Sequence, residues 1–174
     1  GPDFHYDLSI SRLSCPPDGY EDDDGSDTAR ALLIAGGSET HDICPAGDED
    51  WVSFTAQTGT IYVLQTSELG TDADTVLTLY DTDGTTALAT NDDYGYTAAS
   101  RLVWQAPADG TVFAMVKHHN PGAAGADTNY DLSIREGVCI PDPFEGDNGR
   151  LEAVGLISDG QAQTHSFCAD PLSL

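Results

Sequence analysis

The chain has 174 residues, 39% of them hydrophobic and 21% charged, which is typical of a folded globular protein and not of a disordered acidic tail. It carries 30 Asp and Glu against 6 Lys and Arg, a formal net charge of −24. This acidity excludes nucleic acids and anionic membranes as partners, because both bind through Lys and Arg. No apolar run reaches the ~18 residues of a membrane helix. The charge indicates either bound divalent cations or adaptation to a saline habitat.

The first residues belong to an internal repeat. Residues 6–10 read Tyr-Asp-Leu-Ser-Ile, and the same five residues recur at 130–134, an offset of 124 positions. Without gaps, this offset also superimposes Cys15 on Cys139, Glu21 on Glu145, Asp23 on Asp147, Asp24 on Asn148, His41 on His165 and Cys44 on Cys168. We therefore predict the last strand of one repeat over 1–14, a complete repeat over 15–136 and the first third of another over 137–174.

An acidic run, residues 21–24, opens the complete repeat. Adjacent carboxylates in one ordered loop need either full solvation or a hard cation, and Ca²⁺ accepts about six to eight oxygens in irregular geometry. A solvated acidic turn is the alternative. In the second copy the oxygen donors persist as Glu145, Asp147 and Asn148, whereas Asp22 is replaced by glycine. This selective retention favours a calcium site.

The four cysteines form two pairs of equal spacing, Cys15 with Cys44 and Cys139 with Cys168, and none has the spacing of a zinc site. Equal spacing in two copies favours disulfides within each repeat over the two other connectivities that four cysteines allow. Each bond would close a loop of about 30 residues, worth roughly 3 kcal/mol. Such bonds predict an oxidising setting, so we expect a secreted or cell-surface protein.

Most of the complete repeat has the periodicity of β-strands. Short runs rich in β-branched and aromatic residues, such as 61–63, 76–80 and 112–116, are separated by glycine-containing turns. Asp83-Gly84 between 76–80 and 85–89 is typical of a hairpin. This punctuation predicts an all-β fold, an antiparallel β-sandwich. One short helix is expected, starting near Ser26 and continuing over 28–34.

Further acidic groups follow along the chain. Asp48 and Asp50 lie just past Cys44, and a bond between Cys15 and Cys44 would bring them towards the first acidic loop. The segments 72–74 and 91–93, the latter with Asp92 and Asp93, are candidates for a further site or for supporting contacts. Turn closure by the side chain is the preferred interpretation of Asp72, Asp81 and Asp83.

The histidines and the catalytic motifs are less informative. His118 and His119 have no evident third metal ligand, and the recurring His41 and His165 are interpreted as packing residues or as neighbours of the calcium loop. No HExxH, GxSxG or phosphate-binding glycine loop is present, and no cysteine is placed as a nucleophile. We therefore expect a protein that is not an enzyme.

The order of these motifs resembles the bacterial pre-peptidase C-terminal domain. The most specific parts are the acidic loop and the block Gly47-Asp48-x-Asp50-Trp51, and the resemblance extends over Leu79-Tyr80-Asp81, Asn91-Asp92-Asp93 and Tyr130-x-Leu132-x-Ile134. This family, similar to the collagen-binding domains of clostridial collagenases, implies a jelly-roll-like sandwich appended to secreted peptidases and other exported proteins.

The same resemblance implies calcium bound by Glu21, Asp23, Asp24 and Asp50, with Asp48 as a further ligand. A second site built from Glu145, Asp147 and Asn148 is the weaker prediction, because Leu172 stands at the position of Asp48. The cysteine pair is not a general feature of the family.

Two functions are consistent with this interpretation of the sequence. The first is an accessory or adhesive module that binds an extracellular polymer, either a protein fibre or a polysaccharide, with Tyr94 and Tyr96 as contacts. The second is a structural repeat of a stalk, adhesin or filament. In that case neighbouring copies would assemble head-to-tail, the N-terminal strand of one chain completing a sheet in the next.

Overall fold

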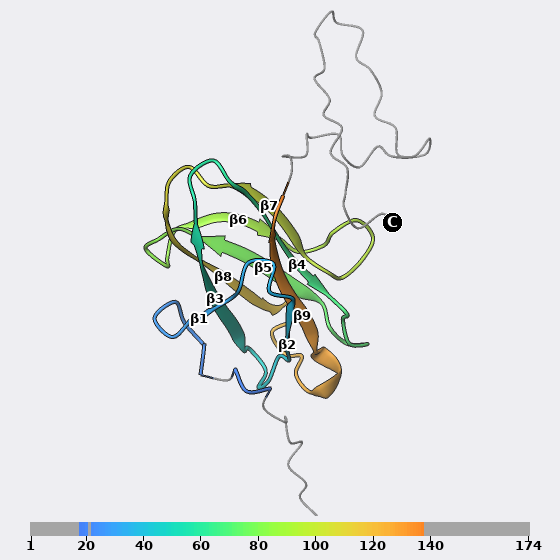
Figure 1. Ribbon diagram of the computed structural model, residues 1–174. Coiled ribbons are helices and arrows are strands. Elements are labelled where there is room, and N and C mark those ends of the chain that lie inside the picture. The colour runs from blue at the N-terminus through green and yellow to red at the C-terminus, as the bar shows by residue number, and fades with distance from the viewer. Residues whose placement is uncertain (1–17, 21, 138–174) are drawn as a thin grey trace, which may run out of the picture.

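The computed structural model describes residues 18–20 and 22–137. Within this part of the chain every regular element except one is a β-strand (Figure 1). The elements are β1 (Arg30–Ala31), β2 (Ser38–His41), β3 (Glu49–Ala56), β4 (Ile61–Ser67), β5 (Thr75–Tyr80), β6 (Ala87–Asn91), β7 (Arg101–Gln105), β8 (Gly110–His118), the 3₁₀ helix η1 (Ala126–Thr128) and β9 (Tyr130–Glu136). No helix with the length and apolarity of a membrane span occurs among the described residues.

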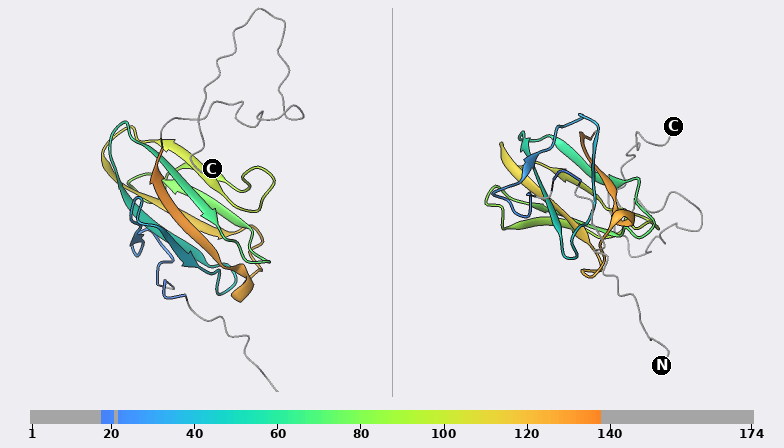
Figure 2. Two further views of the ribbon diagram at one scale, coloured as in Figure 1. Left: turned by 45° about the vertical axis from the view of Figure 1, so that its right-hand side comes forward. Right: turned by 90° about the horizontal axis from the view of Figure 1, so that it is seen from below.

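The strands form two sheets, with the orders β1-β3-β8-β5-β6 and β2-β9-β4-β7. The antiparallel pairs β2/β9, β3/β8, β4/β7 and β5/β6 are those of one long hairpin whose turn lies between β5 and β6. This hairpin wraps so that two of the pairs lie in each sheet, which is the arrangement of a jelly roll. The predicted antiparallel jelly-roll-like sandwich is therefore confirmed, and Figure 2 shows it from two further directions.

The core lies between the inward faces of the two sheets. In β9, the side chains of Tyr130, Leu132 and Ile134 are buried and alternate with partly buried Asp131 and Ser133. This alternation is the period of two expected of a strand, and it gives the repeated Tyr-Asp-Leu-Ser-Ile motif its physical meaning. From the facing sheet the buried residues include Val52, Phe54, Leu77, Leu79 and Val116.

The helix expected over 28–34 is not formed. Arg30 and Ala31 instead make β1, which pairs in parallel with Val52 and Ser53 of β3. The backbone N–H of Leu32 donates to the carbonyl of Ser53 over 2.8 Å, and the Leu32 side chain is buried. Pairing with the edge of β3 and burial of one leucine therefore outweigh the local helical preference of this segment.

The Asp83-Gly84 hairpin is confirmed between β5 and β6. Gly84 has a φ of 65°, a left-handed conformation that favours glycine. The Asp83 carboxylate accepts hydrogen bonds from the backbone N–H of Thr85 and Thr86 and from the Thr86 hydroxyl. These bonds hold the pKa of Asp83 well below its usual range. Its predicted role in closing a turn is thus confirmed.

The described residues cover nearly all of the predicted complete repeat, and the boundaries of the three predicted parts stay a prediction. Residues 1–14, and 138–174 of the last part, lie outside the described residues. The end of β2, the start of β3 and the start of β9 meet at the lower end of the sandwich in Figure 1. This end carries the buried polar side chains of Asp23, His41 and Asp50.

Candidate metal centre at one end of the sandwich

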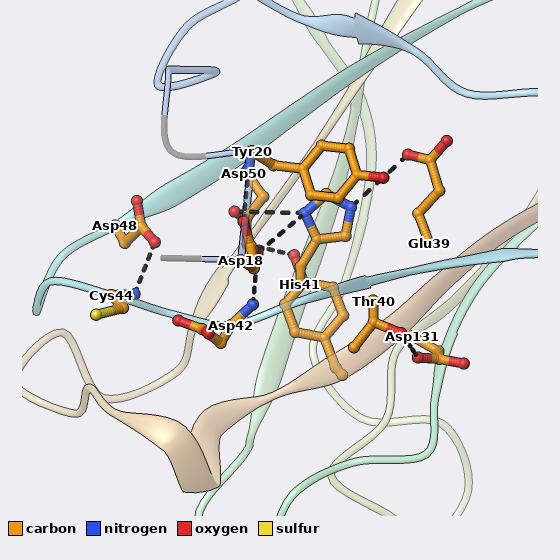
Figure 3. A network of polar contacts seen from close by, with 11 residues as sticks. Asp18, Tyr20, Glu39, Thr40, His41, Asp42, Cys44, Asp48, Asp50 and Asp131 are labelled. Carbon is orange, nitrogen blue, oxygen red and sulfur yellow. Dashed lines mark hydrogen bonds and ion pairs between the residues drawn. The ribbon is translucent and has the colours of Figure 1, made fainter. Parts of the chain in front are cut away.

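Three side chains from separate segments converge at this end (Figure 3). Asp18 precedes β1, His41 is the last residue of β2, and Asp50 is the second residue of β3. One donor atom from each lies within 4.8 Å of those of the other two. The arrangement has the donor types and spacing of a metal-ion site.

Backbone hydrogen bonds fix the loop that carries the acidic residues. The two carboxylate oxygens of Asp18 accept from the backbone N–H of Tyr20 over 2.7 Å and of Asp42 over 2.8 Å. Further along, the N–H of Trp51 donates to the Asp23 carbonyl over 3.1 Å. The loop is thereby tied to the end of β2 and the start of β3, which brings Asp23 to the centre.

His41 is fully buried, with 0% of its surface exposed. The rings of Tyr20 and Tyr130 lie against its imidazole, with centroid distances of 4.5 and 5.5 Å. Its Nδ1 lies 3.6 Å from Asp50 Oδ1 and 3.8 Å from Asp18 Oδ2. Burial alone would lower the pKa of His41, but the Asp50 carboxylate, followed by Asp18 and Asp23, raises it above its usual value.

Asp50 is held by a hydrogen bond from the other sheet. Its side chain is 3% exposed, and its Oδ2 accepts a hydrogen bond from the hydroxyl of buried Tyr130. Burial and the nearby Asp50 carboxylate raise the pKa of Tyr130 well above its usual value, so the phenol remains the donor. His41 of β2 and Tyr130 of β9 are paired residues of neighbouring strands. The register between β2 and β9 therefore positions both side chains that lie against Asp50.

Asp23 is the least compensated carboxylate. It is 2% exposed, and within the described residues its Oδ2 has no hydrogen-bond partner. Burial, and then the negative charges of Asp50 and Asp18, raise its pKa to about 7, although His41 acts in the opposite direction. Leaving a buried carboxylate oxygen unpaired is costly, and a divalent cation would remove this cost. The residues at this centre therefore fit a hard cation.

The calcium ligands predicted from the sequence do not all lie at this centre. Asp23 and Asp50 are both buried, and the charge of Asp50 acts on the Asp23 carboxylate, whereas Asp24 is exposed. One oxygen of Asp48 accepts a hydrogen bond from the Cys44 N–H over 2.7 Å. Glu21 lies outside the described residues, as do the weaker candidates Glu145, Asp147 and Asn148.

Asp18 was not among the ligands predicted from the sequence. Its signal was nevertheless present, because the offset of 124 places Asp142 at the equivalent position of the second copy. His41 was noted only as a packing residue or a neighbour of the calcium loop, and the structure places it at the centre of the group.

A second acidic group lies at the ends of β5, β6 and β8. One carboxylate oxygen each of Asp74, Asp92 and Asp93 lies within 4.8 Å of those of the other two, and the further site predicted here stays a prediction. The exposed His119 lies beside them, its Nδ1 2.8 Å from Asp92 Oδ2. The neighbouring His118 is buried and bonds through Nε2 to the Asp72 carbonyl. His119 compensates Asp92 Oδ2, although Asp92 Oδ1 and Asp74 Oδ1 are buried without a hydrogen-bond partner among the described residues. None of the three carboxylate residues is fully buried, which distinguishes this group from the centre at His41.

Cys44 is disulfide-bonded. Cys15, Cys139 and Cys168 lie outside the described residues. The pairing of Cys44 with Cys15, and of Cys139 with Cys168, therefore stays a prediction.

The two tyrosines predicted as polymer contacts share one turn. Tyr96 is 95% exposed and Tyr94 is 44% exposed, and a bridge between Tyr94 and Thr97 closes the turn. The guanidinium of Arg101 lies 4.8 Å from the centre of the Tyr94 ring and also donates to its hydroxyl. Tyr94 borders an open pocket of about 510 Å³, whose other lining residues include Gln65, Ser67, Glu68, Thr71 and Thr97.

Comparison with solved structures finds similar folds at low identity. The pre-peptidase C-terminal domain of a collagenase from Bacillus anthracis is 13% identical, with a TM-score of 0.48, covering 61% of this chain and 93% of that domain. The periplasmic inhibitor of g-type lysozyme PliG from Aeromonas hydrophila is 12% identical, with a TM-score of 0.43 and coverages of 62% and 96%. The secreted serine protease VesC from Vibrio cholerae is 13% identical, with a TM-score of 0.42 and coverages of 62% and 22%.

A search of curated proteins finds no match. Residues 48–118 match the family model of the bacterial pre-peptidase C-terminal domain. This segment runs from the residue before β3 to the end of β8, and so includes Asp50, the β5–β6 hairpin and the 91–93 motif. The resemblance indicated by the sequence motifs is thereby confirmed: residues 48–118 of the described β-sandwich are similar to the bacterial pre-peptidase C-terminal domain.

Proposed function

We propose that this protein is a non-catalytic, calcium-binding β-sandwich module of a larger secreted protein. The observation that carries the proposal is the grouping of Asp18 and Asp50 with His41, beside the buried Asp23, one of whose oxygens lacks a hydrogen-bond partner among the described residues. The disulfide at Cys44 supports an extracellular setting. Glu21, Asp24 and Asp48 are the further ligands that we propose around these three aspartates.

A calcium ion at this position would compensate the negative charge shared by several chain segments. Asp18 and Asp23 belong to the loop before β1, whereas Asp50 belongs to the sheet. Shared ligation would therefore hold the loop against the sandwich, in addition to the backbone bonds made by Asp18 and Asp23. The role of these residues is to bind and orient, and no group in this arrangement needs to move a proton.

Calorimetric titration of the metal-stripped protein with CaCl₂ at pH 7.5 tests this function. We expect one strong site, and we expect Asp23→Asn to weaken its affinity about ten-fold or more, because a charged ligand is lost. The matched control is Asp22→Asn, which makes the same charge change at an exposed neighbour. Its affinity should stay within about two-fold of the wild type. Absence of calcium binding in the wild type, or equal losses in the two variants, would contradict the proposal.

We also propose that the turn bearing Tyr94 and Tyr96 contacts an extracellular polymer. Arg101 holds the Tyr94 ring beside the open pocket, so its orientation is set before any ligand arrives. Tyr96 adds a fully exposed aromatic surface in the same turn. Rigid aromatic side chains next to polar groups are suited to a protein fibre or a polysaccharide.

Retention on insoluble collagen, chitin and cellulose tests the polymer contact. We expect binding to one of them, with the association constant falling about 30-fold in Tyr94→Ala/Tyr96→Ala, since each of the two aromatic contacts contributes about 1 kcal/mol. Leu88→Ala, which removes another exposed apolar side chain on β6, is the control. If the wild type binds none of the three polymers, the structural alternative is favoured and the calcium proposal is unaffected.

That alternative is a repeat of a stalk or filament built from neighbouring copies. The supporting observation is that β9 lies inside its sheet, paired with β2 on one side and β4 on the other. Residues 6–10 have the same sequence as the first five residues of β9, so a segment with this sequence is suited to the same internal position in another copy.

A further inference from the structure

The imidazole of His41 is the feature that calcium binding alone does not explain. Its side chain is 0% exposed, and within the described part of the chain neither ring nitrogen has a hydrogen-bond partner. A packing histidine normally donates at least one hydrogen bond, because an unpaired buried nitrogen is costly. Three carboxylates surround the ring, yet all three lie beyond hydrogen-bonding distance. The ring atom Nδ1 lies 3.6 Å from Asp50 Oδ1 and 3.8 Å from Asp18 Oδ2, and Nε2 lies 3.9 Å from Glu39 Oε2.

The surrounding contacts keep the ring and the carboxylates apart. Asp18 is fixed by two backbone N–H groups, and Asp50 is fixed by the Tyr130 hydroxyl. The ring itself lies between Tyr20 and Tyr130. Neither the Asp18 nor the Asp50 carboxylate can therefore move towards the His41 ring without losing hydrogen bonds of its own.

The size of this gap matches a shared metal ion. Two ligands at about 2.1–2.3 Å from one ion lie roughly 3.0–3.8 Å apart at ordinary coordination angles. The separations from Nδ1 to Asp50 and Asp18 are at the upper end of this range. Nδ1 also faces the two carboxylates that the calcium proposal uses, as Figure 3 shows.

Donor chemistry then decides the class of ion. Calcium prefers oxygen ligands, whereas imidazole nitrogen favours first-row transition ions. We propose that His41 makes this centre a mixed nitrogen–oxygen site that binds a divalent first-row transition ion, through His41 Nδ1 and the carboxylates of Asp18 and Asp50. This inference rests on the proposed function in using the same carboxylates, but it assigns a different ion class and an additional ligand.

Titration of the metal-stripped full chain with CoCl₂, alone and in the presence of CaCl₂, tests the inference. We expect one Co²⁺ per chain at this centre, in competition with Ca²⁺. His41→Asn should weaken Co²⁺ binding about ten-fold or more but change Ca²⁺ binding by less than about three-fold, since the asparagine oxygen still suits calcium. The matched control is His119→Asn at the exposed second acidic group, which should leave both affinities unchanged.

A second measurement does not depend on a variant of a buried residue. Pulsed electron paramagnetic resonance of the wild-type Mn²⁺ complex should detect one directly bound imidazole nitrogen, and the signal should persist in His119→Asn. A Co²⁺ site that is lost in His119→Asn but kept in His41→Asn would overturn the inference. So would equal losses of Co²⁺ and Ca²⁺ in His41→Asn together with no nitrogen signal in the wild type, a result that would leave His41 a packing residue.

The two proposals fail differently. If Ca²⁺ binds and Co²⁺ does not compete with it, the transition-ion inference is wrong and the calcium function stands. If Co²⁺ binds through His41 and Ca²⁺ does not bind, the calcium function is wrong and the mixed site stands. If neither ion binds, both proposals are wrong.

Discussion

Removal of calcium is expected to lower the melting temperature by about 10 °C at pH 8 and by much less at pH 5. An ion at 100 times its dissociation constant adds about 2.7 kcal/mol to the free energy of unfolding, which corresponds to roughly this shift for a domain of this size. The dependence on pH arises because protons and the cation compete for the same buried carboxylates, of which Asp23 is the least compensated.

The sign of the pH effect follows from the raised pKa values. Asp23 has a pKa of about 7 in the folded protein, so the folded state holds a proton that the unfolded state releases near pH 4. The stability associated with this proton is lost as the pH rises towards and through about 7. The pKa of His41 is also raised, so its contribution is present below about pH 6.5 and is lost at higher pH.

The metal-free protein should therefore become less stable from pH 5 to pH 8, and calcium should remove most of this loss. The opposite contributions of Asp83 and Asp109, whose pKa values are lowered, change only below about pH 4. Thermal unfolding followed by circular dichroism at several pH values, with CaCl₂ or with EDTA, measures both effects.

Asp23→Asn provides the control for this experiment. In EDTA at pH 8 it should melt at a higher temperature than the wild type, because the buried charge is gone, and calcium should stabilise it less. Asp22→Asn, at an exposed position, should behave like the wild type. A wild-type melting temperature that EDTA leaves unchanged at every pH would exclude an ion at this centre.

Replacement of Cys44 by serine is expected to lower the free energy of unfolding by about 3 kcal/mol. If Cys44 is bonded to Cys15, as we predict, the bond closes a loop of about 30 residues and restricts the unfolded chain. The same loop contains Asp18, Asp23 and His41, so its opening should also weaken calcium binding. Chemical denaturation of the oxidised protein and of the variant, with and without calcium, measures the loss.

A double-mutant cycle tests the pairing itself. Cys15→Ser, Cys44→Ser and the double variant should all lose the same stability, because each removes the same bond. Cys168→Ser should leave the stability of this sandwich unchanged. Additive losses in the double variant, or a non-reduced peptide that joins Cys44 to Cys139 or Cys168, would show that the predicted pairing is wrong.

Much of the fold could be predicted from the sequence, because strands and tight turns are local. The alternation in 130–134 marks β9, and Asp83-Gly84 marks the β5–β6 hairpin, since each depends on the residues within the element itself. The helix predicted over 28–34 was wrong because the conformation of this segment is not set by its own residues alone. Its conformation depends on the edge of β3, which lies about 20 residues further along the chain.

The candidate metal centre also has features that could be predicted from the sequence and features that could not. The acidic composition, the repeated pattern of oxygen donors and the family motifs that include Asp23 and Asp50 could all be recognised in the sequence. The three-dimensional structure was needed to show that Asp18 joins them, that Asp24 is exposed, and that His41 faces the carboxylates without a hydrogen bond. The physical reason is that such distances are set by the register between β2 and β9 and by the backbone bonds of the loop to β2 and β3. A local pattern records which face of a strand is buried, but it does not record which strand will lie beside it.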